Sequence, residues 1–156
     1  MSPTIGDTVP DIEFMTTGEQ TRKLTDFRGE NLVLFFYPKA STPGCTTEGQ
    51  DFRDAIDAFA ATATKILGVS LDGLEAQEKF KAKHAFPFEL VSDRDETLCK
   101  LFDVIKLKKL YGKESLGIER STFLIDKTGV LRKQWRKVKV AGHVDEVLAT
   151  TQALDG

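Results

Sequence analysis

Cys45 lies in a segment whose residue types are typical of the start of a helix. Thr42 suits the N-cap position, and Pro43 suits the first helical position, where the missing N–H is not needed. This spacing places Cys45 at the third helical position, where free backbone N–H groups and the positive end of the helix favour an anion. A thiolate is such an anion. The sequence therefore predicts a reactive thiol at Cys45.

A helix terminus alone does not supply enough stabilisation for this thiolate. An ordinary thiol has a pKa of about 8.5 and is only about 3% ionised at pH 7, and mostly ionising it requires about 3 kcal/mol. The helix end contributes at most about 2 kcal/mol, so a cation must contribute the remainder. Arg120 directly precedes the apolar run at residues 121–125, which predicts a strand. We expect this strand end to hold the Arg120 guanidinium beside Cys45.

The motif Pro38-x-x-x-Thr42-x-x-Cys45, followed much later by Arg120, resembles the peroxidatic motif of the peroxiredoxins. The run at residues 37–48 is similar to the bacterioferritin comigratory protein, or peroxiredoxin Q, subfamily. The likeness extends through residues 24–29, 90–93, 111–113 and 135–143, and so covers nearly the whole chain. The resemblance implies a thiol-dependent peroxidase without a cofactor, which reduces hydrogen peroxide and organic hydroperoxides and whose cysteine becomes a sulfenic acid.

The resemblance assigns catalytic roles to Thr42, Cys45 and Arg120. A peroxide needs donors that polarise its oxygens, and the candidates are the Thr42 hydroxyl, the Gly44 and Cys45 backbone N–H groups and Arg120. Two simpler interpretations remain open. Thr42 could act only as a helix cap, and Arg120 could form only a surface ion pair with Glu119 or Glu48.

Three further residues belong to the predicted substrate pocket beside Gly44. Pro38 and Pro43 would shield the thiol from bulk water. Glu48 lies one turn after Cys45 and is expected to orient Arg120 or a loop.

The second cysteine, Cys99, is the only candidate for resolving an oxidised Cys45. Many peroxiredoxin Q proteins carry the resolving cysteine five residues after the first, where this chain has Gln50, and others carry it in the region matching residues 74–84, which contains none. Cys99 lies beside an apolar helical stripe, which favours a structural role. The favoured cycle therefore uses one cysteine and an external thiol, such as a thioredoxin, a glutaredoxin or glutathione. Resolution by Cys99, or a slow redox sensor that a partner protein reads, are the alternatives.

Composition limits the other function classes. The chain of 156 residues has a net charge of −2, which argues against nucleic acid or an anionic membrane as a partner. It shows no basic and apolar leader and no apolar run of about 20 residues, so a cytoplasmic location is expected. The two cysteines form no Cys-x-x-Cys and predict neither a metal site nor a disulfide framework. We expect one domain over residues 1–156, as a monomer or weak dimer.

Alternating apolar runs and amphipathic segments predict an α/β fold. The resemblance implies a thioredoxin-like fold with an N-terminal β-hairpin extension and a central mixed sheet flanked by helices. Predicted strands lie at residues 13–15, 21–24, 32–37, 65–70, 88–91, 121–125 and 130–135. A helix is predicted after Cys45, where Phe52, Ala55, Ile56 and Phe59 recur at helical spacing. Further helices are predicted at residues 74–84, 95–102 and 144–154. Residues 105–117 are rich in lysine and are expected to form an exposed loop or broken helix, with docking of an acidic reductase as the alternative to a merely solvated segment.

Overall fold

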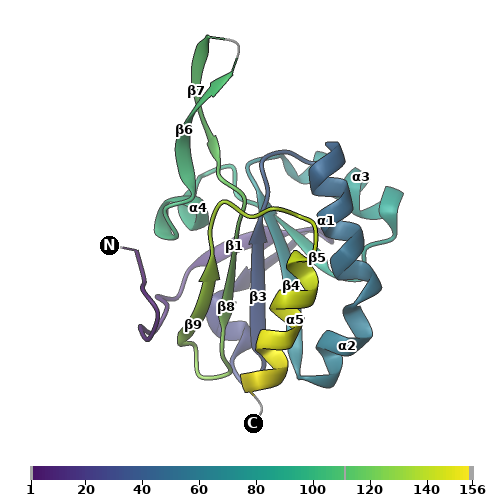
Figure 1. Cartoon of the computed structure of the whole chain (residues 1–156), viewed down its shortest axis with the longest axis vertical. Coiled ribbons are helices and arrows are strands. Elements are labelled where there is room, and N and C mark those ends of the chain that lie inside the picture. The colour runs from purple at the N-terminus through teal and green to yellow at the C-terminus, as the bar shows by residue number, and fades with distance from the viewer. Residues whose placement is uncertain (1, 111, 155–156) are drawn as a thin grey trace.

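The computed structural model describes residues 2–110 and 112–154 and contains a seven-stranded mixed sheet (Figure 1). The strand order is β2-β1-β5-β4-β3-β8-β9. Strands β3, β4 and β5 run parallel, and every other pairing in this sheet is antiparallel. The strand bounds are β1 Glu13–Thr16, β2 Gln20–Lys23, β3 Asn31–Phe36, β4 Thr64–Ser70, β5 Glu89–Ser92, β8 Ser121–Ile125 and β9 Leu131–Trp135.

Two apolar cores form because the central strands are apolar on both faces. Every residue of β3 is buried, and its side chains alternate between the two cores. One core contains Phe52, Phe59, Phe80 and Val147, contributed by α1 (Pro43–Asp54), α2 (Ile56–Ala61), α3 (Leu74–His84) and α5 (His143–Leu154). The other core lies under α4 (Thr97–Leu101), the 3-10 helix η1 (Leu24–Phe27) and the N-terminal segment. The sheet therefore separates the two cores.

The predicted thioredoxin-like architecture, with its N-terminal hairpin and mixed sheet, is confirmed. The expected loop or broken helix at residues 105–117 is wrong. Strands β6 (Ile105–Leu110) and β7 (Lys113–Ile118) form an antiparallel hairpin there, which projects from the body of the molecule (Figure 1). Apolar side chains alternate with lysines over residues 105–108, which is the period of a strand, and Lys109 then breaks the alternation.

The fold brings the two ends of the predicted site together at one edge of the sheet. Strand β3 ends at Phe36, and the chain then forms a loop that leads into α1. Strand β8 is antiparallel to β3 and begins at Ser121, which is the register partner of Phe36. Arg120 directly precedes β8, so it must lie beside the loop that carries Cys45.

In the residues that the structure describes, none of the helices has the length and apolar character needed to span a bilayer.

Candidate active site

The thiol of Cys45 lies in the first turn of α1 and faces Arg120. Helix α1 begins at Pro43, so Cys45 is its third residue, as the sequence predicts. The side chain of Cys45 is only 1% exposed. Arg120 donates a hydrogen bond from Nη2 to Cys45 Sγ at 3.5 Å, a normal length for a sulfur acceptor. The cation that a thiolate at this position requires is therefore present.

A buried carboxylate holds the same arginine from its other side. Arg120 Nη1 donates to Glu48 Oε1 at 2.6 Å, so one guanidinium bridges Glu48 and Cys45. Glu48 is fully buried, and its Oε2 has no hydrogen-bond partner in the described part of the chain. Burial raises the pKa of Glu48 to about 7, and the nearby Arg120 only partly opposes this.

The charge of Arg120 is secure in this setting. Burial opposes the charge of a guanidinium, but the partners Glu48 and Cys45 outweigh this effect and raise the pKa of Arg120 above its ordinary value. The alternative of a surface ion pair with Glu119 or Glu48 matches this geometry in one respect, since Arg120 does pair with Glu48, but the Arg120 side chain is only 16% exposed and Glu48 is fully buried, so the pair does not lie on the surface.

Gly44 allows the arginine to approach the start of the helix closely. A Cβ atom at this position would lie 3.1 Å from Arg120 Nη2, which is tighter than an ordinary contact. The first helical hydrogen bond runs from the Thr46 N–H to the Thr42 carbonyl. The N–H groups of Gly44 and Cys45 therefore precede the helical ladder, and neither donates to another described residue. Both remain available to an acceptor.

Thr42 occupies the N-cap position, but its side chain does not cap the helix as the sequence suggests. Its hydroxyl donates instead to the carbonyl of Lys39 at 2.8 Å, and no cap hydrogen bond forms. The loop therefore uses the Thr42 hydroxyl to close its own turn. A peroxide bound here can donate to the Thr42 oxygen, whereas accepting from Thr42 requires the Lys39 bond to open. Pro38 is partly buried in this loop, and Pro43 is exposed.

A network of polar residues that the sequence did not reveal anchors this loop. The Ala40 N–H donates to Asp72 Oδ2 at 2.8 Å, and the Ser70 hydroxyl donates to the same oxygen at 2.6 Å. The buried Tyr37 hydroxyl donates to Gln77 Oε1 at 2.5 Å. Ser41 has a φ of +66°, in the left-handed region that a residue with a side chain rarely adopts. These bonds fix the loop firmly enough to hold such a residue.

The second cysteine lies on the opposite side of the sheet from the first. Cys99 is fully buried in the core under α4, whereas Cys45 belongs to the core under α1. The Cys99 backbone N–H donates to Asp93 Oδ2 at 2.8 Å. Burial and the adjacent Asp93 carboxylate raise the pKa of the Cys99 thiol far above its ordinary value. This geometry matches a structural cysteine.

His143 stands behind the site as a neutral, buried side chain. It begins α5, and its Nε2 lies 2.8 Å from the Thr122 hydroxyl. Its ring meets the rings of Phe52 and Trp135 edge to face. Burial lowers the pKa of His143 to about 4, so the imidazole carries no charge at neutral pH.

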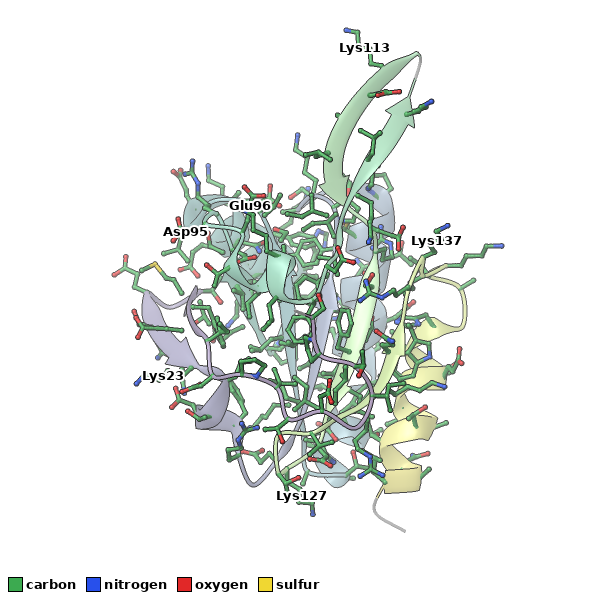
Figure 2. The ribbon with its side chains drawn as sticks, turned by 90° about the vertical axis from the view of Figure 1, so that its left-hand side faces the viewer. Lys23, Asp95, Glu96, Lys113, Lys127 and Lys137 are labelled. Atoms are coloured by element: carbon green, nitrogen blue, oxygen red, sulfur yellow. The ribbon has the colours of Figure 1, made fainter. Side chains whose placement is uncertain are left out.

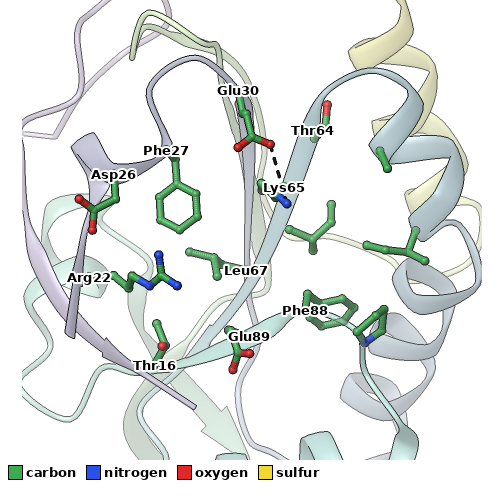
Figure 3. Close-up of a pocket in the computed structure, with 14 residues that line it drawn as sticks. Thr16, Arg22, Asp26, Phe27, Glu30, Thr64, Lys65, Leu67, Phe88 and Glu89 are labelled. Carbon is green, nitrogen blue, oxygen red and sulfur yellow. Dashed lines mark ion pairs between the residues drawn. The ribbon is translucent and has the colours of Figure 1, made fainter. Parts of the chain in front are cut away.

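A pocket of about 360 Å³ lies elsewhere, between β4 and the N-terminal hairpin (Figure 3). Phe27, Leu67 and Phe88 line it, and Lys65 and Glu30 form an ion pair of 3.9 Å at one side. Its lining includes neither cysteine, and no group of three or more His, Cys, Asp or Glu residues in residues 2–110 and 112–154 could hold a metal ion. The pocket therefore lacks the chemistry of the Cys45 site.

A thioredoxin-like fold that holds a thiol at a helix start against a buried arginine defines a class of proteins, the thiol-dependent peroxidases. Comparison with known proteins gives the same class. Residues 5–134 match the model of the AhpC/TSA family. The peroxiredoxin Bcp of Bacillus subtilis is 54% identical over 150 residues, which cover 96% of each chain.

Solved structures agree with the sequence comparison. A structure of the Xanthomonas campestris bacterioferritin comigratory protein matches with a TM-score of 0.89 and 50% identity, covering 93% of this chain and 92% of that one. A mutant peroxiredoxin Q of Xylella fastidiosa matches with a TM-score of 0.94 and 43% identity, covering 100% of this chain and 99% of that one. The chain belongs to the AhpC/TSA family, within its Bcp or peroxiredoxin Q group, and is a thiol-dependent peroxidase.

Proposed function

We propose that this protein reduces hydrogen peroxide and organic hydroperoxides through the thiolate of Cys45, in a cycle that an external thiol completes. The observation that carries the proposal is the single guanidinium of Arg120, which contacts both Cys45 and the buried Glu48 at the start of α1. A cation in this position stabilises the thiolate and also the charge that develops on a peroxide oxygen.

The first step breaks the O–O bond of the peroxide. The Cys45 sulfur attacks one oxygen and becomes a sulfenic acid, while the bonding electron pair leaves with the other oxygen, which takes up a proton and departs as water or an alcohol. Arg120 and the free N–H groups of Gly44 and Cys45 are the donors assigned to these oxygens. The role assigned to Thr42 is to accept a hydrogen bond from the peroxide while its own hydroxyl continues to donate to the Lys39 carbonyl.

The second step returns the sulfur to the thiol state. An external thiol attacks the sulfenic sulfur and forms a mixed disulfide with release of water, and a second thiol then displaces Cys45 as the free thiol. Two thiols are oxidised to one disulfide for each peroxide reduced. A thioredoxin, a glutaredoxin or glutathione can supply them. The placement of Cys99 beneath the opposite face of the sheet supports an external thiol over Cys99 in this role.

The choice of organic hydroperoxides as substrates draws on a relative. The Xanthomonas campestris protein, at 50% identity, has been studied for its alkyl peroxide reduction activity in complexes with trapped intermediates and ligands. We extend that substrate class to this chain because the two proteins share the family and the fold.

Two serine variants test the proposal. Cys45→Ser should abolish peroxide consumption, whereas Cys99→Ser should leave it largely intact with a monothiol or dithiol donor. Mass spectrometry after one equivalent of peroxide should find a sulfenic acid on Cys45. An intrachain disulfide to Cys99, or equal loss of activity in both variants, would overturn the one-cysteine cycle. Turnover that stops after about one peroxide per Cys45 would instead indicate a sensor.

A further inference from the structure

The β6–β7 hairpin presents two exposed leucines that no part of the described chain covers. Leu107 is 58% exposed and Leu116 is 72% exposed. The two are register partners across the hairpin, so their side chains lie next to each other on one face of the ribbon. An isolated two-stranded ribbon is at best marginally stable in water, and an adjacent pair of exposed leucines on a projecting ribbon is a candidate contact site.

The apolar face of the hairpin continues outward from the core. The pair at its base, Ile105 and Ile118, packs into the core under α4, and Ile118 is only 1% exposed. Because side chains on one face recur every second residue, Leu107 and Leu116 extend the same stripe beyond the body of the protein. The base is fixed: Arg136 donates to the carbonyls of Phe102 and Asp103 at 2.8 and 2.9 Å.

The hairpin also reverses the charge of the molecule locally. It carries four lysines and one glutamate, a net charge of +3, in a chain whose net charge is −2. Two of the lysines are paired, Lys106 with Asp103 and Lys109 with Glu114. Lys108 and Lys113 form no ion pair within residues 2–110 and 112–154, and Lys113 lies near the tip (Figure 2). An acidic partner surface would complement this charge.

The hairpin is joined directly to the site. Strand β7 ends at Ile118, two residues before Arg120, and the Glu119 N–H donates to the Val104 carbonyl at 2.7 Å. The hairpin therefore leaves the body of the protein at the edge of the sheet where Cys45 lies (Figure 1). A protein seated on the hairpin is positioned beside the oxidised sulfur.

We propose that the β6–β7 hairpin is the docking arm for the protein thiol that reduces Cys45, and that this partner presents acidic residues around an apolar centre. The inference rests on the proposed function, because only a cycle completed by an external thiol needs such a partner. A second copy of this chain fits less well as the occupant, since two hairpins facing each other would bring lysines against lysines.

The test compares a protein reductant with a small one. Turnover of hydrogen peroxide is measured with thioredoxin and its reductase, with glutaredoxin, and with dithiothreitol. The variants are Leu107→Ser with Leu116→Ser, and Lys108→Glu with Lys113→Glu. Each pair should raise the KM for the protein reductant about tenfold or more, since it removes apolar contacts or reverses complementary charge. The dithiothreitol rate and the single-turnover oxidation of Cys45 should not change.

Matched controls carry the same changes elsewhere on the surface. Met15→Ser removes another exposed apolar side chain, which is 47% exposed, and Lys23→Glu with Lys127→Glu reverses two lysines away from the hairpin (Figure 2). These controls should leave the KM unchanged. If the double serine variant fails to fold, the hairpin variant Lys108→Glu with Lys113→Glu still tests the proposal.

Three results would overturn the docking arm. The first is an unchanged KM in both hairpin variants, and the second is a wild-type protein that no protein reductant recycles faster than dithiothreitol at equal thiol concentration. The third is a wild-type dimer, measured by light scattering, that the leucine variant converts to a monomer, because the hairpin would then bind a second copy. Failure of the proposed function looks different, since Cys45 would then resist oxidation by peroxide before any reductant is added.

Discussion

Replacing Glu48 with glutamine, which keeps the shape of the side chain but removes its charge, should change how the stability of the protein depends on pH. Glu48 is fully buried, and burial raises its pKa from the ordinary value of 4.5 to about 7 in the folded protein. Between these two values the folded state binds more protons than the unfolded state. The stabilising effect of the protonated carboxyl is therefore complete below pH 4.5 and is lost as the pH rises through 7.

The magnitude follows from the two pKa values. A difference from 4.5 to about 7 corresponds to about 3 kcal/mol, since each pH unit is worth about 1.36 kcal/mol. Because a domain is typically stable by only about 5–15 kcal/mol, this is a measurable fraction. Glu48→Gln cannot titrate. The free energy of unfolding of the variant, minus that of the wild type, should therefore rise by about 3 kcal/mol between pH 4.5 and 8.

Urea unfolding across this pH range, followed by circular dichroism, measures the difference. Both proteins should carry Cys45→Ser, which prevents oxidation and keeps position 45 uncharged, so that only Glu48 differs in its titration. Other titrating groups cancel in the subtraction. A difference that stays constant with pH, or that falls, would refute the reasoning and would mean that Glu48 stays ionised against Arg120 throughout.

His143 should produce the opposite dependence. Burial lowers the pKa of His143 from 6.5 to about 4, so its contribution to stability is lost as the pH falls through this range. In the same urea experiment, the free energy of unfolding of His143→Gln should gain about 3 kcal/mol relative to the wild type between pH 6.5 and 4. Arg120→Lys keeps the charge but lacks the planar pair of nitrogens with which Nη1 reaches Glu48 and Nη2 reaches Cys45. Stopped-flow measurement should therefore find the oxidation of Cys45 slowed by about 10²-fold, and a rate near that of the wild type would contradict the donor role. Gly44→Ala places a Cβ atom 3.1 Å from Arg120 Nη2 and should slow the same oxidation about tenfold. The better helix propensity of alanine should leave the stability unchanged or higher by up to about 1 kcal/mol. An unchanged rate of oxidation would show that Arg120 moves freely.

The elements that the sequence predicted well are those with an unambiguous period. The apolar run of β3 and the helical stripe through Phe52 and Phe59 were sufficient to place a strand and then a helix around Cys45. The break between α1 and α2 at Ala55 was not visible, because alanine gives no stop signal. The β6–β7 hairpin was missed because the apolar alternation in β6 covers only residues 105–108 and is broken at Lys109, which is too short a pattern to indicate a strand.

Within the site, the sequence could indicate which residues carry chemistry but not what holds them. Cys45 and Arg120 could be paired from their motif and from the energy that a thiolate requires. The bond from Ala40 to Asp72 joins residues 32 positions apart, and that from Tyr37 to Gln77 joins residues 40 apart. Such contacts depend on how β4 and α3 pack, and no local sequence pattern predicts them. The turn that Thr42 closes with Lys39 likewise competes with helix capping, and the sequence permits both.

Arg120 bonds to both Glu48 and Cys45, so two substitutions of Glu48 should affect the oxidation of Cys45 differently. The bond of 2.6 Å to Glu48 holds the guanidinium in place, whereas the ionised carboxylate also draws its charge away from Cys45. Glu48→Gln keeps an oxygen for the bond and removes the competing charge, so it should preserve the rate of Cys45 oxidation and weaken its dependence on pH near 7, where Glu48 titrates. Glu48→Ala removes the bond as well, and the oxidation should slow at every pH because the arginine is no longer held. Stopped-flow oxidation by hydrogen peroxide between pH 5.5 and 8.5 separates the two effects. Equal rates for both variants would show that Glu48 acts only through its charge and does not position Arg120.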